Sequence, residues 1–129
     1  MSHIVKGKVT VAYSDPVVFK TALAGLGIVL TNERLYRVAV GYTTERYDLV
    51  LQHLEKPQFR LGFNLEGGRY MPYQEDYGDV GEWTRRVSAE LADMYLAQHY
   101  AAALRAENYQ VEIRRENGHL EVIAEEAVW

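Results

Sequence analysis

The stretch EDYGDVGEW, residues 75–83, holds the densest group of side chains that could do chemistry. Its carboxylates Glu75, Asp76 and Asp79 could bind a metal ion or transfer protons. A calcium or magnesium site needs several oxygen atoms that converge on one ion, and a helix–loop–helix calcium loop spaces its acids at alternating positions before a glycine and a distant glutamate. The spacing here is different. We therefore predict no metal and no cofactor, and these three acids are the candidate ligands if a site exists.

The same acids have a structural explanation. Asp79 stands where the first residue before a helix would lie, and Glu82 follows three residues later, as in a capping box. Acidic side chains at this end of a helix are also stabilised by its positive dipole end. We expect a long helix to begin here, with Trp83 as its first large core contact.

Few other groups suggest catalysis. The four histidines stand at 3, 53, 99 and 119, so no pair has the spacing of three or four residues that is typical of metal-binding pairs on a helix. His99 lies on the expected long helix, where it could be a general base or an interfacial side chain. No serine lies in a Gly-x-Ser-x-Gly elbow. The chain has no cysteine, which excludes thiol nucleophiles, disulfides and thiolate zinc sites.

Composition predicts one soluble domain over residues 1–129. The chain has 48% apolar and 25% charged residues, as globular proteins do. No apolar run approaches the roughly 20 residues of a membrane helix, and the start does not read as a signal peptide. Together with the absence of cysteine, these features predict a cytoplasmic protein.

The net charge of −4 is unevenly distributed along the chain. Residues 1–72 hold nine Lys/Arg and six Asp/Glu, whereas residues 73–129 hold five and twelve. An acidic second half disfavours binding to a nucleic-acid backbone, which requires a concentrated basic face.

The first part of the chain is predicted to be rich in strands. Alternation predicts a strand over residues 7–13, and Pro16 after Ser14 and Asp15 begins a short helix over 16–25. Further strands are expected at 28–31, 35–43 and 47–54, with turns at 32–33 and 44–46.

Two hairpins are predicted from their turn residues. Gly67-Gly68 between alternating runs fits a two-residue turn, with Glu66 opposite Arg69. In this hairpin, Pro72 indicates that the second strand lies at a sheet edge or ends there. Asn117-Gly118 is the favoured pair for a second hairpin, whose inward face should hold Tyr109, Val111, Ile113, Leu120 and Val122.

A long helix over 80–107 separates the two hairpins. Apolar residues recur in it every three or four positions, which is the period of an amphipathic helix. The predicted fold class is α+β: a mainly antiparallel sheet with one short and one long helix, on one face of the sheet. The strand–helix start and the helix–hairpin end resemble a ferredoxin-like layout, an analogy that does not determine function.

One aromatic and basic surface is a candidate binding site. Tyrosine, tryptophan and arginine are enriched at protein interfaces, and aromatic residues with arginines can also stack on nucleic-acid bases. The RNA-recognition aromatic signature is missing, so we favour a protein interface. The candidate residues are Arg60, Arg69, Tyr70, Tyr73, Tyr77 and Trp83.

Several short motifs resemble a known family. They are the Met-Ser-His-Ile start, ALAGLG, YDLVLQ, LGFNLEGGRY, the acidic-aromatic loop and the final hairpin closing on Trp129. Over nearly the whole chain they resemble the domain-of-unknown-function family 1257, small proteins of cyanobacteria, plastid genomes and other bacteria. The loop has less tryptophan than we expect in many relatives. The family offers no catalytic residues to carry over, and its gene neighbourhoods, which contain AAA-type ATPases, imply a partner role.

Three functions are open. The leading hypothesis is a small cytosolic binding or adaptor protein that acts through a protein partner or self-association. The second is a small-molecule or metal-dependent enzyme that uses residues 75–79 and His99. The third is nucleic-acid binding, which the acidic second half disfavours.

Overall fold

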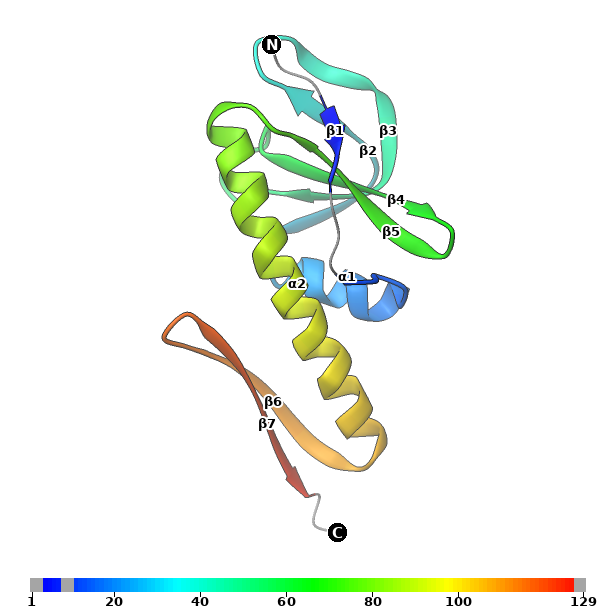
Figure 1. The fold of residues 1–129 in the computed structure, drawn as a ribbon, viewed down its shortest axis with the longest axis vertical. Helices are drawn as coiled ribbons and strands as arrows, with labels where there is room; N and C mark the ends of the chain where they lie inside the picture. Colours follow the sequence, from blue (N-terminus) through cyan, green and yellow to red (C-terminus); the bar gives the residue numbers. More distant parts are fainter. Residues whose placement is uncertain (1–3, 8–10, 127–129) are drawn as a thin grey trace.

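The computed structural model describes residues 4–7 and 11–126. Five strands form one antiparallel sheet in the order β1-β5-β4-β3-β2, and β6 and β7 form a separate hairpin (Figure 1). The predicted α+β class is confirmed. The elements are β1 (Ile4–Lys6), α1 (Pro16–Ala24), β2 (Ile28–Arg37), β3 (Gly41–Gln52), β4 (Arg60–Glu66), β5 (Arg69–Glu75), α2 (Gly78–Ala106), β6 (Tyr109–Glu116) and β7 (His119–Glu126).

The sheet is a meander, with one strand added at its edge. Strands β2 to β5 pair with their neighbours in chain order, and β1 joins β5 in antiparallel orientation. The strand–helix start and the helix–hairpin end that suggested a ferredoxin-like layout are both present. The strand order, however, is that of a simple meander.

The start of the chain differs from the predicted strand over 7–13. β1 covers Ile4–Lys6, and residues 11–13 are not in a strand. Residues 8–10 of that prediction lie outside the described residues. Tyr13 is nevertheless buried, and its carbonyl accepts a hydrogen bond from the N–H of Tyr70 (3.0 Å). Backbone pairing therefore holds this segment against β5 without extending β1.

Helix α1 begins as its sequence predicts. The carboxylate of Asp15 accepts hydrogen bonds from the N–H groups of Val17 (3.0 Å) and Val18 (3.2 Å), which satisfies two donors that lack helical partners. Pro16 occupies the first turn, where a missing N–H costs nothing. The helix ends at Ala24, one residue before the predicted end.

The predicted turns at 32–33 and 44–46 are wrong. They lie within β2 and β3, two long strands that pair across these positions, Glu33 with Tyr47 and Arg34 with Arg46. The polar residues of both segments are exposed, apart from the half-buried Glu33, which Arg46 contacts at 3.1 Å. The turn is at residues 38–40, where Ala39 has φ 63 and the following Gly41 has φ 113. Polarity indicated exposure here, and not a reversal of the chain.

Both glycine-containing hairpins are confirmed with the predicted registers. Gly67 (φ 59) and Gly68 (φ 80) occupy a turn that needs positive φ, and Glu66 pairs with Arg69. Asn117 and Gly118 also have positive φ, and Glu116 pairs with His119.

Strand β5 does not end at Pro72. It continues to Glu75, and β1 pairs with these last residues, so they are not at the sheet edge. The carbonyl of Pro72 accepts a hydrogen bond from the N–H of Gly7 (2.9 Å). Proline is tolerated here because it still offers an acceptor on that side.

The capping box predicted for the long helix is wrong. The residue before α2 is Tyr77, without a side-chain cap, and Asp79 lies in the first turn. An acid in this turn still meets the positive end of the helix dipole. The predicted apolar stripe is confirmed for its large residues: the buried side chains include Val80, Trp83, Val87, Leu91 and Tyr95.

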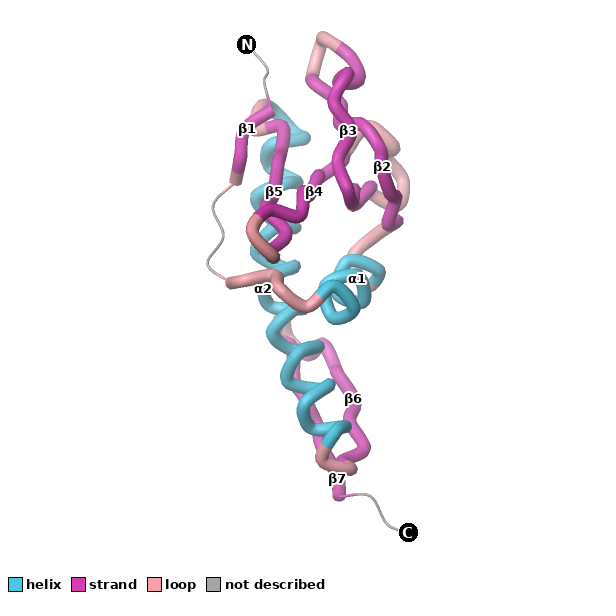
Figure 2. Tube along the Cα trace, turned by 90° about the vertical axis from the view of Figure 1, so that its right-hand side faces the viewer, coloured by secondary structure: helices cyan, strands magenta, loops and turns pink. Residues whose placement is uncertain are grey.

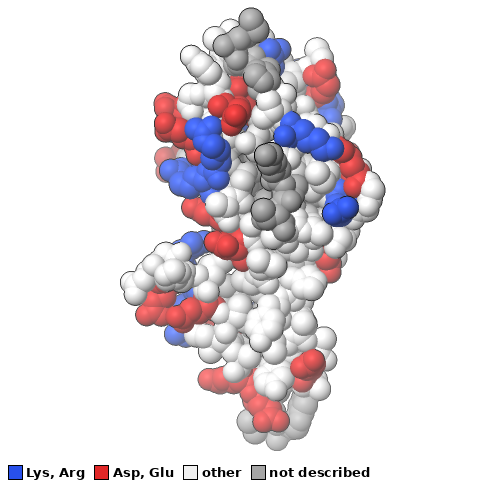
Figure 3. Space-filling view, viewed as in Figure 1, with Lys and Arg blue, Asp and Glu red and all other residues white. Residues whose placement is uncertain are grey.

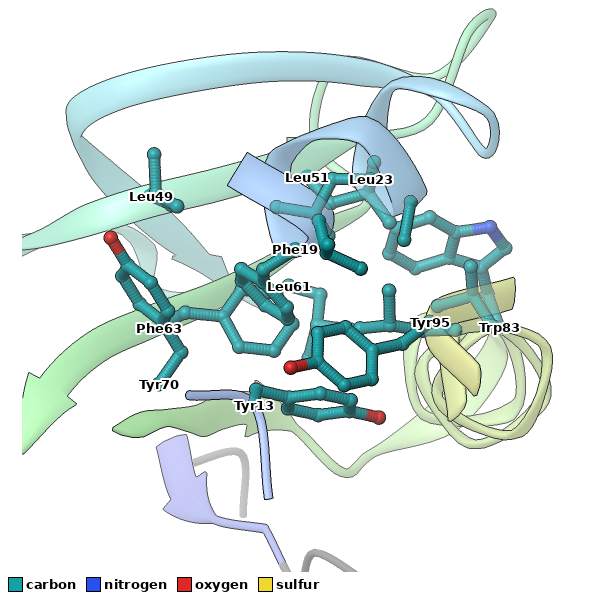
Figure 4. Packing of buried hydrophobic residues seen from close by; sticks show 14 residues of the cluster. Tyr13, Phe19, Leu23, Leu49, Leu51, Leu61, Phe63, Tyr70, Trp83 and Tyr95 are labelled. Carbon is teal, nitrogen blue, oxygen red and sulfur yellow. The ribbon is translucent and has the colours of Figure 1, made fainter. Parts of the chain in front are cut away.

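Phe19 lies at the centre of the core. Its ring stacks on Tyr70 at 4.7 Å and meets Phe63 and Tyr13 edge-on or tilted, each at 4.9 Å. Figure 4 shows these rings between the sheet and the two helices, with Trp83 on the α2 side. Both helices therefore cover the same face of the sheet, as predicted.

Helix α2 is longer than the body that it covers. At 1.5 Å per residue its 29 residues span about 43 Å. Its second half leaves the sheet and carries the β6–β7 hairpin, and the two form a narrow extension below the body (Figures 1 and 2). We call α2 from residue 89 onward, together with β6 and β7, the arm; its first turns still pack on the body through Leu91 and Tyr95.

We expect Phe19→Ala to lower the free energy of unfolding by about 3–5 kcal/mol, because it removes a ring that contacts β4, β5, α2 and Tyr13. Urea denaturation measures this change. Val17→Ala is the matched control, because Val17 is on the same helix but 74% exposed, and it should change stability by less than about 0.5 kcal/mol. Equal effects of the two substitutions would contradict this account of the core.

Alkaline pH should destabilise the fold through Tyr13. Burial, and then the nearby Asp93 and Tyr95, raises the pKa of Tyr13 from 10.0 to about 12. The stability that protonated Tyr13 adds to the fold is therefore complete below pH 10 and is lost as the pH rises toward 12. Tyr13→Phe should lose less stability than the wild type over this range in urea denaturation. Identical pH profiles would show that Tyr13 does not titrate in this way.

Candidate functional site

The six residues of the predicted aromatic and basic surface do not form one surface. Tyr70 and Trp83 are each only 7% exposed and belong to the core. Arg69 and Tyr77 are exposed but flank opposite ends of β5, about 20 Å apart at 3.3 Å per residue. Tyr73 is half-buried. A binding role for Arg69 and Tyr77 stays a prediction, but not as part of one patch with the others.

Arg60 has a structural role. Its side chain is 10% exposed and donates hydrogen bonds to the carbonyls of Pro57 (2.8 Å) and Arg34 (2.9 Å). Its guanidinium also lies over the ring of Tyr42 at 4.9 Å. Through these contacts, the guanidinium of Arg60 links β4 to β2 and to the loop before β4.

The acids of the 75–79 loop point to different partners. Glu75 is 1% exposed, and its carboxylate accepts hydrogen bonds from the N–H groups of Val38 (2.9 Å) and Tyr77 (3.2 Å). Asp76 is exposed and pairs with Arg85 at 3.0 Å, and Asp79 lies in the first turn of α2. Among residues 4–7 and 11–126, no three acids or histidines converge as metal ligands would.

The enzyme hypothesis cannot combine this loop with His99. Asp79 and His99 are separated by about 30 Å along α2 at 1.5 Å per residue. The ring of His99 stacks on that of Tyr95 at 5.9 Å. An acid–base mechanism based on residues 75–79 would need a different partner for its carboxylates.

Lys6, Glu66 and Tyr73 form a polar cluster that sequence analysis missed. The Lys6 ammonium contacts the Glu66 carboxylate at 2.7 Å, and the Tyr73 hydroxyl donates a hydrogen bond to the other carboxylate oxygen. The hydrogen bond from Lys6 lowers the pKa of Glu66, and the hydrogen bonds to Glu66 raise the pKa values of Lys6 and Tyr73.

All three of these shifts move the pKa values away from neutrality. General acids and bases work best with a pKa near the operating pH. Here Glu66 stays ionised, whereas Lys6 and Tyr73 keep their protons at neutral pH. The cluster is suited to joining β1 to the β4–β5 hairpin, and not to proton transfer.

A cleft of about 750 Å³ lies beside this cluster. It is lined by Lys6, Glu66, Arg69 and Tyr70 on one side and by Val11 to Tyr13 on the other. Residues 8–10, which join Gly7 to Val11, lie outside the described residues. We therefore assign the cleft no ligand.

The arm carries an apolar surface that residues 4–7 and 11–126 leave exposed. On α2, the side chains of Ala89, Ala92, Leu96, Tyr100 and Ala103 recur at intervals of three or four residues, so they lie along one side of the helix. Leu96 is 53% and Tyr100 58% exposed. This set, which we call the outer stripe, faces away from the residues of α2 that pack on the body.

A groove of about 370 Å³ continues the outer stripe onto the hairpin. Leu96, Ala97 and Tyr100 line it from α2, and Leu120 and Val122 line it from β7. Asp93 and His119 add its polar groups. Figure 3 shows mostly uncharged atoms around this half of α2, with acidic side chains beside them. The groove therefore combines apolar side chains with polar groups, as protein interfaces do.

The hairpin does not supply a core of its own. None of the residues of β6 or β7 is buried, and the predicted inward face is half-buried at Val111, Ile113, Leu120 and Val122. Tyr109 of that face is 37% exposed. Beyond Tyr95, Ala101 is the one buried residue of α2. The predicted inward packing is thus partial, because it is directed at α2 and not at the sheet.

Sequence analysis missed the outer stripe although its spacing was visible. Alanine favours a helix at any position, and the large residues of the buried face alone account for the amphipathic period. Leu96 and Tyr100 lay outside that face. A second set of apolar residues at intervals of three or four is the signal that identifies a helix with two apolar sides.

Comparisons with protein-family models, with curated proteins and with solved structures find no significant match in any of the three. The resemblance to the domain-of-unknown-function family 1257 stays a prediction. Neither α1 nor α2, as described, is both long and apolar enough to cross a membrane.

We expect Glu75→Ala to lower the free energy of unfolding by about 2–4 kcal/mol, because the N–H groups of Val38 and Tyr77 lose their acceptor. Asp79→Ala, which removes an exposed acid of the same loop, should cost less than about 1 kcal/mol. Thermal and urea unfolding measure both. If Glu75→Ala left stability unchanged or raised it, the buried carboxylate would have to be explained by function.

Proposed function

We propose that this protein is a small binding or adaptor protein that acts through its arm. The observation that carries the proposal is the outer stripe, on which two large apolar side chains, Leu96 and Tyr100, are more than half exposed beside a groove with both apolar and polar walls. Contiguous exposed apolar surface with a polar margin is typical of interaction sites.

The construction of the arm supports this proposal. A two-stranded hairpin is marginally stable alone, and here it packs against α2. Covering the outer stripe would remove apolar area from water, at about 25 cal/mol for each Å². A partner that covers the stripe therefore stabilises the least buried part of the chain.

Two kinds of partner are consistent with the proposal. One is another copy of the chain, and the other is a different protein, for which the family resemblance suggests an AAA-type ATPase. Both would contact the outer stripe, so one experiment can test the surface before the partner is identified.

Photo-cross-linking tests whether the arm is a binding surface. A benzoylphenylalanine at position 96 or 100 should give protein adducts when the full chain is irradiated in native cell extract. The matched control is position 54, because Leu54 is also an exposed leucine (70%) but lies on the body. Adducts at 96 and 100 but not at 54 support the proposal.

The same experiment can contradict the proposal in two ways. Absence of adducts at positions 96 and 100 would remove the arm as a binding surface. Equal adduct yields at 54 and 96 would show that any exposed apolar side chain reacts. Circular dichroism of each variant confirms that the helix is intact.

A further inference from the structure

We propose that the occupant of the outer stripe is a second copy of this chain, bound so that two α2 helices pair in antiparallel orientation about a two-fold axis at Leu96. This inference rests on the proposed function and names its partner. Two-fold pairs are the commonest assemblies of identical chains, and they require a surface that is complementary to itself.

The order of small and large residues along the outer stripe meets this requirement. With Leu96 on the axis, Leu96 faces its own copy, Ala92 faces Tyr100, and Ala89 faces Ala103. Each large ring thus lies against a small side chain, which is how packed layers avoid both voids and overlap. The alanines at the ends also let the two helices approach closely.

The location of the stripe leaves room for a second helix. It faces away from Leu91 and Tyr95, which are buried against the body. A copy that lies on the stripe therefore has its own body on the far side. The hairpin lies beside the stripe, and its Leu120 and Val122 extend the apolar surface toward the copy through the groove.

The charges of the helix also permit such a pair. Between residues 89 and 103, α2 carries only Glu90 and Asp93 as charged residues. The acids of the hairpin lie outside the contact between the two outer stripes and repel the acids of the second copy from a distance. Salt screens this repulsion, with a screening length of about 10 Å at 0.1 M. Added salt should therefore strengthen this pair, whereas it would weaken the binding of a basic partner to the acidic arm.

The expected strength is modest. The stripe from residue 89 to 103 is about 22 Å long at 1.5 Å per residue. Such a seam belongs to the smaller class of interfaces, below about 1,200 Å² in total, which are typically weak and reversible. We expect a monomer–dimer equilibrium that depends on concentration, and sedimentation equilibrium on the full chain measures it.

Cysteine substitutions test the geometry without background, because the chain has no cysteine. Helices that pack 8–10 Å apart bring facing Cα atoms to roughly 4–6 Å, which a disulfide can span. Leu96→Cys should form a disulfide-linked dimer on mild oxidation. Leu54→Cys, at a leucine of the body that is 70% exposed, should stay monomeric.

The register has its own test. Ala92→Cys and Tyr100→Cys should each cross-link poorly alone, because the two copies of either cysteine are about 12 Å apart along the axis. An equimolar mixture of the two variants should form the mixed disulfide. Self-linking of each variant as fast as the mixture would overturn the register.

Leu96→Glu tests the energetics, since it places two like charges on the axis. We expect at least a tenfold weaker dimer with unchanged circular dichroism, because Leu96 is already more than half exposed. Leu96→Met, which keeps the apolar contact, should still dimerise. A dimer that tolerates Leu96→Glu would overturn the proposal.

The outcomes separate this inference from the proposed function. A wild-type chain that stays monomeric at every concentration and salt overturns the second copy as occupant. If position 96 then still gives photo-adducts with another protein, the proposed function stands with a different partner. If it gives none, both proposals fail.

Discussion

The ring of Phe19 is the contact on which the body of this protein depends. It brings α1 onto β4, β5 and the segment around Tyr13, with Phe63 and Tyr70 as its closest neighbours in the sheet. Helix α2 closes the same cluster with Trp83 and Tyr95. Since these rings fill the space between the sheet and the helices, they determine how far along α2 the core can reach.

The extent of the core along α2 accounts for the arm. The large buried side chains of α2 end at Tyr95, yet the helix continues to Ala106. Alanines favour a helix in this part of α2. The hairpin runs back along it, and no residue of β6 or β7 is buried. The molecule therefore has one well-packed body and one thin extension. The stability of the extension depends on how much apolar surface α2 and the hairpin can hide from water.

Local patterns predicted the elements whose cause is local. Asn117-Gly118 specifies a turn because a two-residue turn needs positive φ at both positions, which Asn and Gly adopt readily. Asp15 with Pro16 specifies a helix start. The turn assigned to residues 32–33 failed because polarity in a long exposed strand resembles polarity in a loop. The candidate site failed for a related reason: Tyr70 and Trp83 have the composition of an interface, and only tertiary packing shows that they belong to the core.

The composition of the outer stripe suits an interface that forms and dissociates. Alanine contributes helix propensity and little exposed apolar area, so a stripe with three alanines and two large residues exposes less apolar area in the monomer than a stripe of leucines would. Replacing the alanines with leucines would strengthen pairing but leave a larger apolar patch exposed in the monomer. The proposed pair would therefore be a weak association and not a permanent assembly. In such an interface, Leu96 and Tyr100 supply most of the apolar area and the alanines set how closely the helices approach.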